Sequence, residues 1–372
     1  MIIQPYTSAH QRKFSIANSL HIDTTLFIGL LLLASLGLMI LFSASNQNPD
    51  IIIRQLTRLA VAFTVMIVVA QISPGQLRFW APWLFAIGIA LLVATLVFGE
   101  GKGADRWLNL GFVRFQPSEL VKISLPMMLA WYLADRALPP KPSRVIVCGV
   151  LIVVPTLLIA KQPDLGTSLL IASSGIFVML LSGIRWRFVF GAITVAVAAA
   201  PLLWINMHAY QQRRVLTFLN PETDKLGAGW HIVQSKIALG SGGTYGKGWL
   251  NGTQSHLEFL PERSTDFIFA VYGEEFGLMG ILLLLSMYLF IIARGLYIAS
   301  RAQDTFARLL GGSIAITFFF NVFVNVGMVT GLLPVVGLPL PIVSYGGTSM
   351  VTLMVAFGIL MSIHTHRKLL SQ

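Results

Sequence analysis

Residues 257–277 place acidic and basic side chains directly before an apolar run. Glu262, Arg263 and Asp266 come first, and residues 267–271 follow without a charged side chain. A carboxylate at the boundary between water and an apolar helix is costly to desolvate, so Asp266 is a candidate catalytic carboxylate. The alternative is a helix cap, because Asp is favoured at the positive end of a helix. Position alone leaves both interpretations open.

Further charged residues lie inside apolar segments or at their ends. Glu119 and Lys122 are three residues apart in one such segment, and therefore on one helix face. Together and facing other helices, the two charges are tolerable, so a structural ion pair is the alternative to a functional role. Lys161 and Asp164 bracket a proline at the end of another apolar segment, and both are candidate substrate-binding residues together with Glu119 and Lys122.

Glu274 follows Asp266 by eight residues, which predicts that both lie on one stripe of a continuous helix. All these charged sets fall in one predicted leaflet. We therefore expect a water-accessible polar cavity that opens outward.

The elements that position these residues are predicted from composition. Of 372 residues, 55% are hydrophobic and only 11% are charged, whereas soluble domains carry about 25% charged residues. The chain is therefore predicted to be an all-α integral membrane protein, and at about 20 residues per span it has room for about ten transmembrane helices. The expected spans are about 26–43, 56–72, 83–98, 117–134, 145–160, 166–182, 188–205, 267–293, 307–330 and 349–363.

Most Lys and Arg residues of the short loops fall on the side of the N-terminus, which predicts that both termini are cytoplasmic. We expect a single membrane domain, residues 1–372, with cytoplasmic tails at 1–25 and 364–372. One large extracytoplasmic loop, 206–265, lies between the seventh and eighth spans. The net charge of +11 is then explained by basic cytoplasmic loops and contact with anionic membrane lipids, and not by nucleic acid.

Three other features bear on function. Residues 240–252 are rich in glycine but lack the Ser or Thr of a phosphate-binding loop, so a flexible loop is favoured. Residues 331–349 contain three prolines between two apolar spans, and such a segment at membrane depth must be buried in protein or line a cavity. The lone cysteine, Cys148, excludes a disulfide framework and a cysteine-based metal site.

Five motifs resemble those of the SEDS family of cell-wall proteins, in order and over about residues 20–368. They are VRFQPSELVKI, AKQPDLGTSLL, LGAGWHIVQSKIALGSGG, GKGWLNGTQSHLEFLPERSTDFIFAVYGEEFG and LPVVGLPLPIVSYGGTSM. In detail they are closest to the branch of the family that acts in cell elongation.

The resemblance implies a ten-helix peptidoglycan glycosyltransferase in the bacterial inner membrane. It would polymerise lipid II, a disaccharide-peptide on undecaprenyl pyrophosphate, at the outer face of that membrane. The essential aspartate of the family corresponds to Asp266. The implied partners are a class B penicillin-binding protein, which is a transpeptidase, and the MreC/MreD elongation scaffold.

With this substrate, Asp266 is expected to act as general base on the attacking sugar hydroxyl, a role that typically contributes about 10²–10⁴-fold in rate. The pyrophosphate leaves readily once its charge is neutralised, so one carboxylate and several cations should suffice. A divalent cation (Mg²⁺ or Mn²⁺) could serve, and no organic cofactor is expected. Candidate cationic side chains are Lys122, Lys161, Arg214, Lys236 and Arg263.

Two other functions stay open. Intramembrane charges and proline-broken segments are also typical of transporters, here a lipid II flippase. A non-catalytic scaffold for a transpeptidase would tolerate replacement of Asp266.

Overall fold

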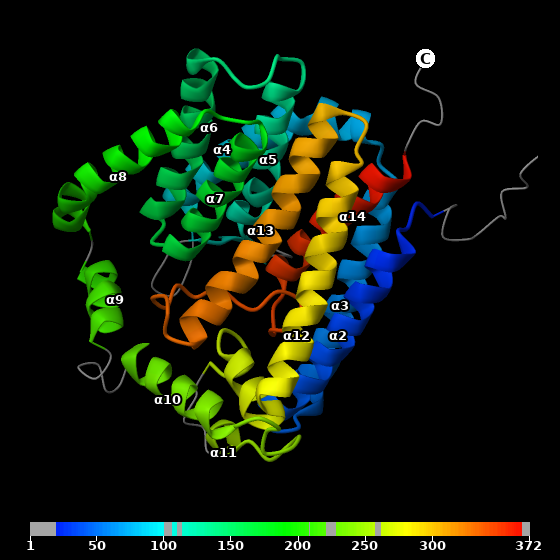
Figure 1. The fold of residues 1–372 in the computed structure, drawn as a ribbon, viewed down its shortest axis with the longest axis vertical. Helices are drawn as coiled ribbons and strands as arrows, with labels where there is room; N and C mark the ends of the chain where they lie inside the picture. Colours follow the sequence, from blue (N-terminus) through cyan, green and yellow to red (C-terminus); the bar gives the residue numbers. More distant parts are fainter. Residues whose placement is uncertain are drawn as a thin grey trace, which may run out of the picture.

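The computed structural model describes residues 20–99, 106–109, 114–207, 209–220, 228–256 and 262–366. These residues form a bundle of long helices, with shorter helices grouped beyond one end of it (Figure 1). The helices are α2 (Thr24–Ala44), α3 (Pro49–Ala70), α4 (Pro74–Phe98), α5 (Pro117–Ala134), α6 (Pro142–Lys161), α7 (Leu165–Leu181), α8 (Trp186–Asn206), α9 (Ala209–Leu219), α10 (Ala228–Ser241), α11 (Thr253–His256), α12 (Ile268–Ser300), α13 (Thr305–Val329) and α14 (Thr348–Thr365).

Seven of the described helices are long and apolar enough to cross a membrane: α2, α3, α4, α6, α12, α13 and α14. A two-stranded antiparallel sheet of β1 (Leu108–Asn109) and β2 (Arg114–Phe115) is a small addition to this helical architecture. The predicted all-helical, multi-pass membrane protein is confirmed. Of about ten predicted crossings, seven are supported by helix length and hydropathy within the described part of the chain.

Local sequence signals explain where these helices begin. Proline occupies the first turn of α3, α4, α5 and α6, where its missing N–H is not needed. The Asp23 side chain caps α2 by accepting a hydrogen bond from the Leu26 N–H at 2.8 Å. Ser73 and Gln76 form a reciprocal capping box at the start of α4.

The first and last membrane helices meet at one end of the bundle through Asp23. Its carboxylate Oδ2 lies 2.6 Å from Arg294 Nη2 of α12 and 2.5 Å from His364 Nδ1 of α14. Burial alone would raise the pKa of Asp23, but hydrogen bonds from His364, Arg294 and the Leu26 N–H hold that pKa well below its usual value. The start of α2 and the end of α14 therefore lie at the same end of the bundle.

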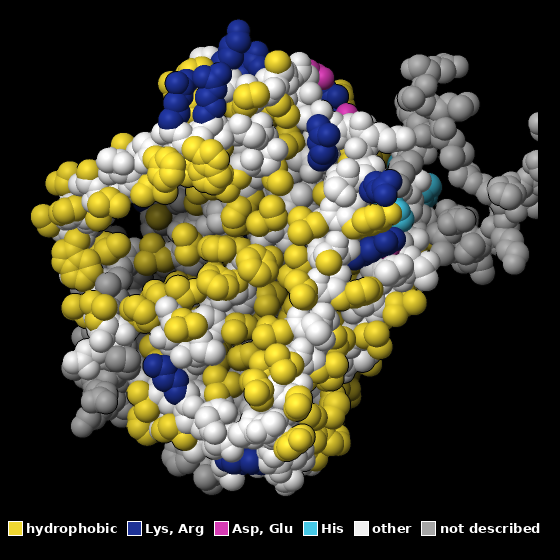
Figure 2. Space-filling view, in the orientation of Figure 1, with side chains coloured by type: hydrophobic (Ala, Val, Ile, Leu, Met, Phe, Trp, Pro, Cys, Tyr) yellow, Lys and Arg dark blue, Asp and Glu magenta, His cyan; other side chains and the backbone are white. Residues whose placement is uncertain are grey.

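The surface also divides into zones along the bundle. Lys and Arg side chains gather at the end that carries the α5–α6 connection, and a broad hydrophobic band separates this end from the α10–α11 end (Figure 2). This distribution agrees with the basic cytoplasmic loops predicted from sequence. Within the band α8 lies away from the bundle and packs closely against none of the other described helices (Figure 1).

Helix α12 provides the span predicted at about 267–293, but this helix is not continuous, because the chain turns sharply at Gly277 (φ 62°, ψ −162°). The segment before the turn packs back on the segment after it: the Tyr272 hydroxyl donates to the Gly280 carbonyl at 2.9 Å. In a straight helix, residues eight apart are separated by about 12 Å along the axis. The predicted common helical stripe for Asp266 and Glu274 is not formed either, because Asp266 lies in the turn before α12 and outside the helix that carries Glu274.

Candidate active site

Asp266 lies in a turn that ends just before α12 and is partly buried. The N-cap of α12 is Phe267, and no side chain caps this helix by a hydrogen bond. The helix-cap interpretation of Asp266 is therefore wrong. The backbone of the turn is held instead by Asn325 of α13, whose Nδ2 donates to the Asp266 carbonyl at 3.0 Å and to the Leu338 carbonyl at 2.7 Å.

The proline-rich segment 331–347 donates hydrogen bonds to the backbone of the Asp266 turn. The Ser344 hydroxyl donates to the Thr265 carbonyl at 2.5 Å, and the Tyr345 N–H donates to the Ser264 carbonyl at 2.9 Å. Gly337 has a positive φ of 74° and faces the carboxylate: a Cβ built there would lie 3.6 Å from Asp266 Oδ2. The turn that carries the candidate catalytic side chain is thus held by contacts from two parts of the chain, α13 and residues 331–347.

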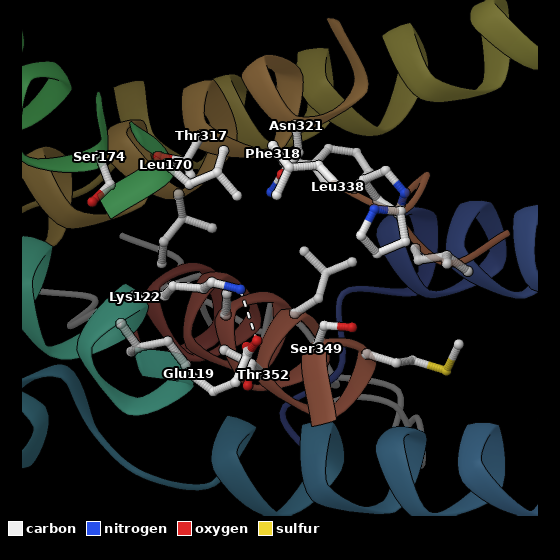
Figure 3. Close-up of a pocket in the computed structure, with 18 of the residues that line it drawn as sticks. Glu119, Lys122, Leu170, Ser174, Thr317, Phe318, Asn321, Leu338, Ser349 and Thr352 are labelled. Atoms are coloured by element: carbon white, nitrogen blue, oxygen red, sulfur yellow. Dashed lines mark hydrogen bonds and ion pairs between the residues drawn. The ribbon is translucent and has the colours of Figure 1, made fainter. Parts of the chain in front are cut away.

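A cavity of about 110 Å³ lies on the other side of this segment, within the bundle. Its walls come from α5, α7, α13, α14 and residues 338–346, which confirms that the proline-rich segment lines a cavity (Figure 3). Lys122 Nζ pairs with Glu119 Oε1 at 2.7 Å in this cavity, opposite Ser349 and Thr352 of α14 (Figure 3). This volume accommodates a few water molecules but is smaller than the roughly 300–1,000 Å³ of a typical ligand pocket.

Two buried oxygen atoms in the cavity wall have no hydrogen-bond partner among the described residues. They are Glu119 Oε2 and the Thr317 hydroxyl oxygen, from α5 and α13. Buried polar atoms are nearly always hydrogen-bonded, to water if not to protein. The cavity is therefore suited to hold water or polar atoms of a ligand.

Asp164, predicted as a substrate-binding residue, caps α7. Its Oδ1 accepts from the Thr167 N–H at 3.2 Å, and its Oδ2 lies 3.6 Å from Arg106 Nη1 and 3.3 Å from Gln116 Nε2. Lys161, predicted with it, is exposed at the end of α6. Asp164 therefore has a structural role as the cap of α7. Lys161 is not among the residues that line the cavity.

The two glutamates of α12 accept hydrogen bonds from other parts of the chain. Glu274 is fully buried and its Oε1 accepts from Lys247 Nζ at 2.7 Å, the Thr253 hydroxyl at 2.9 Å and the Gln254 N–H at 3.1 Å. Ser43 of α2 donates to Glu275. The single cavity expected for all the charged sets is thus not observed: Glu119 and Lys122 face it, whereas Glu274 holds the glycine-rich loop.

The remaining predicted cations lie around the Asp266 turn or outside the described side chains. Arg263 is partly buried three residues before Asp266. Lys236 of α10 is exposed, and its stem covers Gly331, where a side chain would overlap Lys236 Cε. Arg214 belongs to α9, but its side chain lies outside the described residues.

Sequence reasoning missed Asn325 and Ser344, which position the turn. An amide within an apolar span is costly unless it is satisfied, so Asn325 carried a signal that could have been used. Ser344 had no such signal, because its partner Thr265 is distant in sequence.

A family model described as "Cell cycle protein" (FTSW_RODA_SPOVE) matches residues 18–369, nearly the whole chain. The chain belongs to the SEDS family. Among curated SEDS relatives, it is 54% identical to the peptidoglycan glycosyltransferase MrdB of Escherichia coli K12, over 95% of this chain and 96% of that protein. It is 32% identical to the peptidoglycan glycosyltransferase RodA of Treponema pallidum, over 93% and 98% of the two chains.

Solved SEDS structures agree in fold. One chain comes from a study of a peptidoglycan synthase complex that coordinates polymerization and crosslinking. It matches with a TM-score of 0.80 and 30% identity, over 91% of this chain and 96% of that one. The rod shape-determining protein RodA of Thermus thermophilus matches with a TM-score of 0.70 and 27% identity, over 92% and 97% of the two chains.

Proposed function

We infer that this SEDS protein is a peptidoglycan glycosyltransferase, and we propose that it polymerises lipid II during cell elongation. Near-complete coverage of a relative at 54% identity supports the enzyme class. The observation on which the mechanism depends is the fixed Asp266 carboxylate, backed by Gly337 and separated by one segment of chain from the Glu119–Lys122 cavity.

In the proposed reaction, Asp266 accepts the proton from the 4-hydroxyl of the acceptor sugar as that oxygen attacks the anomeric carbon of the donor. The bond from the anomeric carbon to the pyrophosphate breaks, and the pyrophosphate leaves with the bonding electrons. Direct displacement inverts the anomeric carbon. A positioned carboxylate is needed because a sugar hydroxyl is a weak nucleophile at neutral pH.

Cations must compensate the charge of the leaving pyrophosphate. Arg263 is close to Asp266 in sequence, Lys122 lies in the adjoining cavity, and Lys236 lies where residues 331–347 begin. Arg214 and Lys161 stay as weaker proposals, Arg214 without a described side chain and Lys161 away from the cavity. Asp164 would act through α7, whose first turn packs against residues 336–338.

A divalent cation would need ligands from the substrate. Among the described residues, no three His, Cys, Asp or Glu side chains are grouped closely enough to hold a metal. Mg²⁺ is commonly bound by one or two carboxylates together with phosphate oxygens, which Asp266 and the pyrophosphate could provide. When bound, it would neutralise charge on the leaving group.

We propose that the polyprenyl chain lies between α8 and the bundle. The space-filling view is hollowed there (Figure 2), and α8 and α7 carry exposed apolar side chains, among them Ile193 and Ile176. With α5, α7 and α8 counted as further crossings, the chain would span the inner membrane about ten times. Residues 206–265 would then face outward and both termini the cytoplasm.

The partner proposed from the resemblance is a class B penicillin-binding protein. The match to a chain from a peptidoglycan synthase complex supports such a pairing. MreC and MreD would then act on the assembled pair, as scaffold proteins of elongation.

The test is glycan synthesis by purified protein and labelled lipid II in detergent, with and without the transpeptidase. Wild type should form polymer, and Asp266→Asn should lower the rate at least about 100-fold while lipid II still binds. Asp266→Glu keeps the negative charge but displaces the carboxylate by one methylene group. This variant serves to distinguish loss of the base from loss of the fold. Because detergent has no two sides, a flippase or a scaffold would give no polymer under any of these conditions.

A further inference from the structure

Arg58 lies deep within the apolar helix α3. It is the tenth residue of a membrane-spanning helix, so its Cα lies about 14 Å from the helix start along the axis. Arginine at such depth normally faces a carboxylate, a carbonyl or a polar cavity. Arg58 is partly exposed, and within the described part of the chain it has no ion pair and no hydrogen bond.

The one described partner of Arg58 is an aromatic ring. Its Cζ lies 4.4 Å from the ring centroid of Tyr345. Stacking uses the face of the guanidinium group and fixes its plane, but leaves the N–H donors along the edge available. Those donors match two oxygens of a phosphate group in a bidentate geometry.

The surroundings of Arg58 include exposed apolar side chains and a second arginine. Helix α14, which packs beside α3, begins only at Thr348, and a Cβ on its N-cap Gly347 would lie 3.9 Å from Arg58 Nε. The outer half of α3 therefore extends beyond the start of α14, and its Ile53 and Leu56 side chains are more than half exposed. Arg54, one turn outward on the same face, is also exposed.

Arg58 is also joined to the candidate active site by the backbone. Tyr345, on which it stacks, donates its N–H to Ser264, two residues before Asp266. Ser344 and Gly346 line the Glu119–Lys122 cavity. Tyr345, which lies between them, and Gly347, which follows them, contact Arg58 instead. The segment thus separates two cationic positions, Lys122 on one side and Arg58 on the other.

We propose that Arg58, held by Tyr345, binds the phosphate group of a membrane lipid that enters from the outer leaflet beside α3. A membrane lipid supplies both the anionic oxygens for the guanidinium edge and acyl or prenyl chains for the exposed apolar face of α3. The phosphate could belong to an anionic phospholipid or to the polyprenyl substrate. Only the second source rests on the proposed function.

The test is native mass spectrometry of the full-length protein in detergent, titrated separately with phosphatidylglycerol, undecaprenyl pyrophosphate and diacylglycerol. Arg58→Gln should weaken binding of at least one phosphate-bearing lipid by about ten-fold, and diacylglycerol binding should not change. Arg136→Gln is the matched control, because Arg136 also stacks on a tyrosine, Tyr132, but near the end of α5 that carries the basic loops. Its affinity for both lipids should equal that of wild type.

The lipid whose affinity falls identifies the source of the phosphate. A loss confined to phosphatidylglycerol supports the site even if the enzymatic proposal fails. Tyr345→Leu gives a second measure if Arg58→Gln is poorly folded: it should also weaken binding, whereas Tyr345→Phe should not. Unchanged affinity for both phosphate lipids in Arg58→Gln, or in Tyr345→Leu when only that variant folds, would overturn the proposal, as would an equal loss in Arg136→Gln.

Discussion

The Asp266 carboxylate lies against Gly337, at a distance where a single methyl group would make van der Waals contact with Oδ2. Gly337 also adopts a left-handed backbone conformation, with φ of 74°, that costs other residues about 1–2 kcal/mol. The positive φ favours glycine at this position, and an added methyl group would touch the carboxylate of the candidate base without overlapping it.

Gly337→Ala should therefore lower the polymerisation rate by about ten-fold or more, because misplacing a catalytic group by a fraction of an ångström is costly. Rates with labelled lipid II, compared with the thermal midpoint of unfolding, measure the effect. Gly149→Ala is the control: it lies in α6 with no atom within 4 Å of the added Cβ, and both quantities should stay at or above wild type. A wild-type rate in Gly337→Ala would show that the carboxylate is not held by this segment.

Asn325→Ala removes the amide that links the Asp266 turn to Leu338. Two backbone carbonyls then lose their donor, which should destabilise the protein by about 1–3 kcal/mol and reduce activity. Thermal unfolding in detergent and the glycan assay measure the two effects. Ser286→Ala, on the exposed face of α12, serves as control. A variant with reduced stability but full activity would contradict the positioning role.

The Glu119–Lys122 pair can be tested by a double-mutant cycle. Lys122→Met leaves a buried carboxylate without its partner and should cost about 3–5 kcal/mol, whereas Glu119→Gln with Lys122→Met should recover most of that stability. If the pair also binds substrate, the double variant is stable but remains deficient in polymerisation. Recovery of both stability and activity would leave the pair with a structural role alone.

Asp23→Asn tests the charged cluster that joins α2, α12 and α14. Because the folded pKa of Asp23 is lowered, its contribution to stability is complete above the unfolded pKa of about 3.9 and is lost as pH falls through the lower folded pKa. The difference in thermal midpoint between wild type and Asp23→Asn should therefore be constant from pH 7 to about 5 and shrink below about pH 4. A difference that does not vary between pH 7 and 3 would exclude the carboxylate charge as its cause.

The sequence predicted the helical membrane architecture because a run of about 20 apolar residues has few other solutions. Asp266 could be singled out from the cost of a carboxylate beside such a run. The turn at Gly277 could not, since it depends on backbone bonds from Leu278 and Met279 to Gly243 and Thr244, which lie far back in the chain. The same holds for Glu274, whose partners come from the glycine-rich loop that local sequence reads as flexible.

The reversal at Gly277 has a mechanical consequence. Residues 268–276 form a short helical segment: backbone N–H groups of the glycine-rich loop bond to carbonyls near its C-terminal end, and Asp266 lies directly before its N-terminal end. A protein that bound that loop would contact a segment joined directly to the candidate base. A change in the position of the loop would then reach Asp266 through a small tilt of this segment alone.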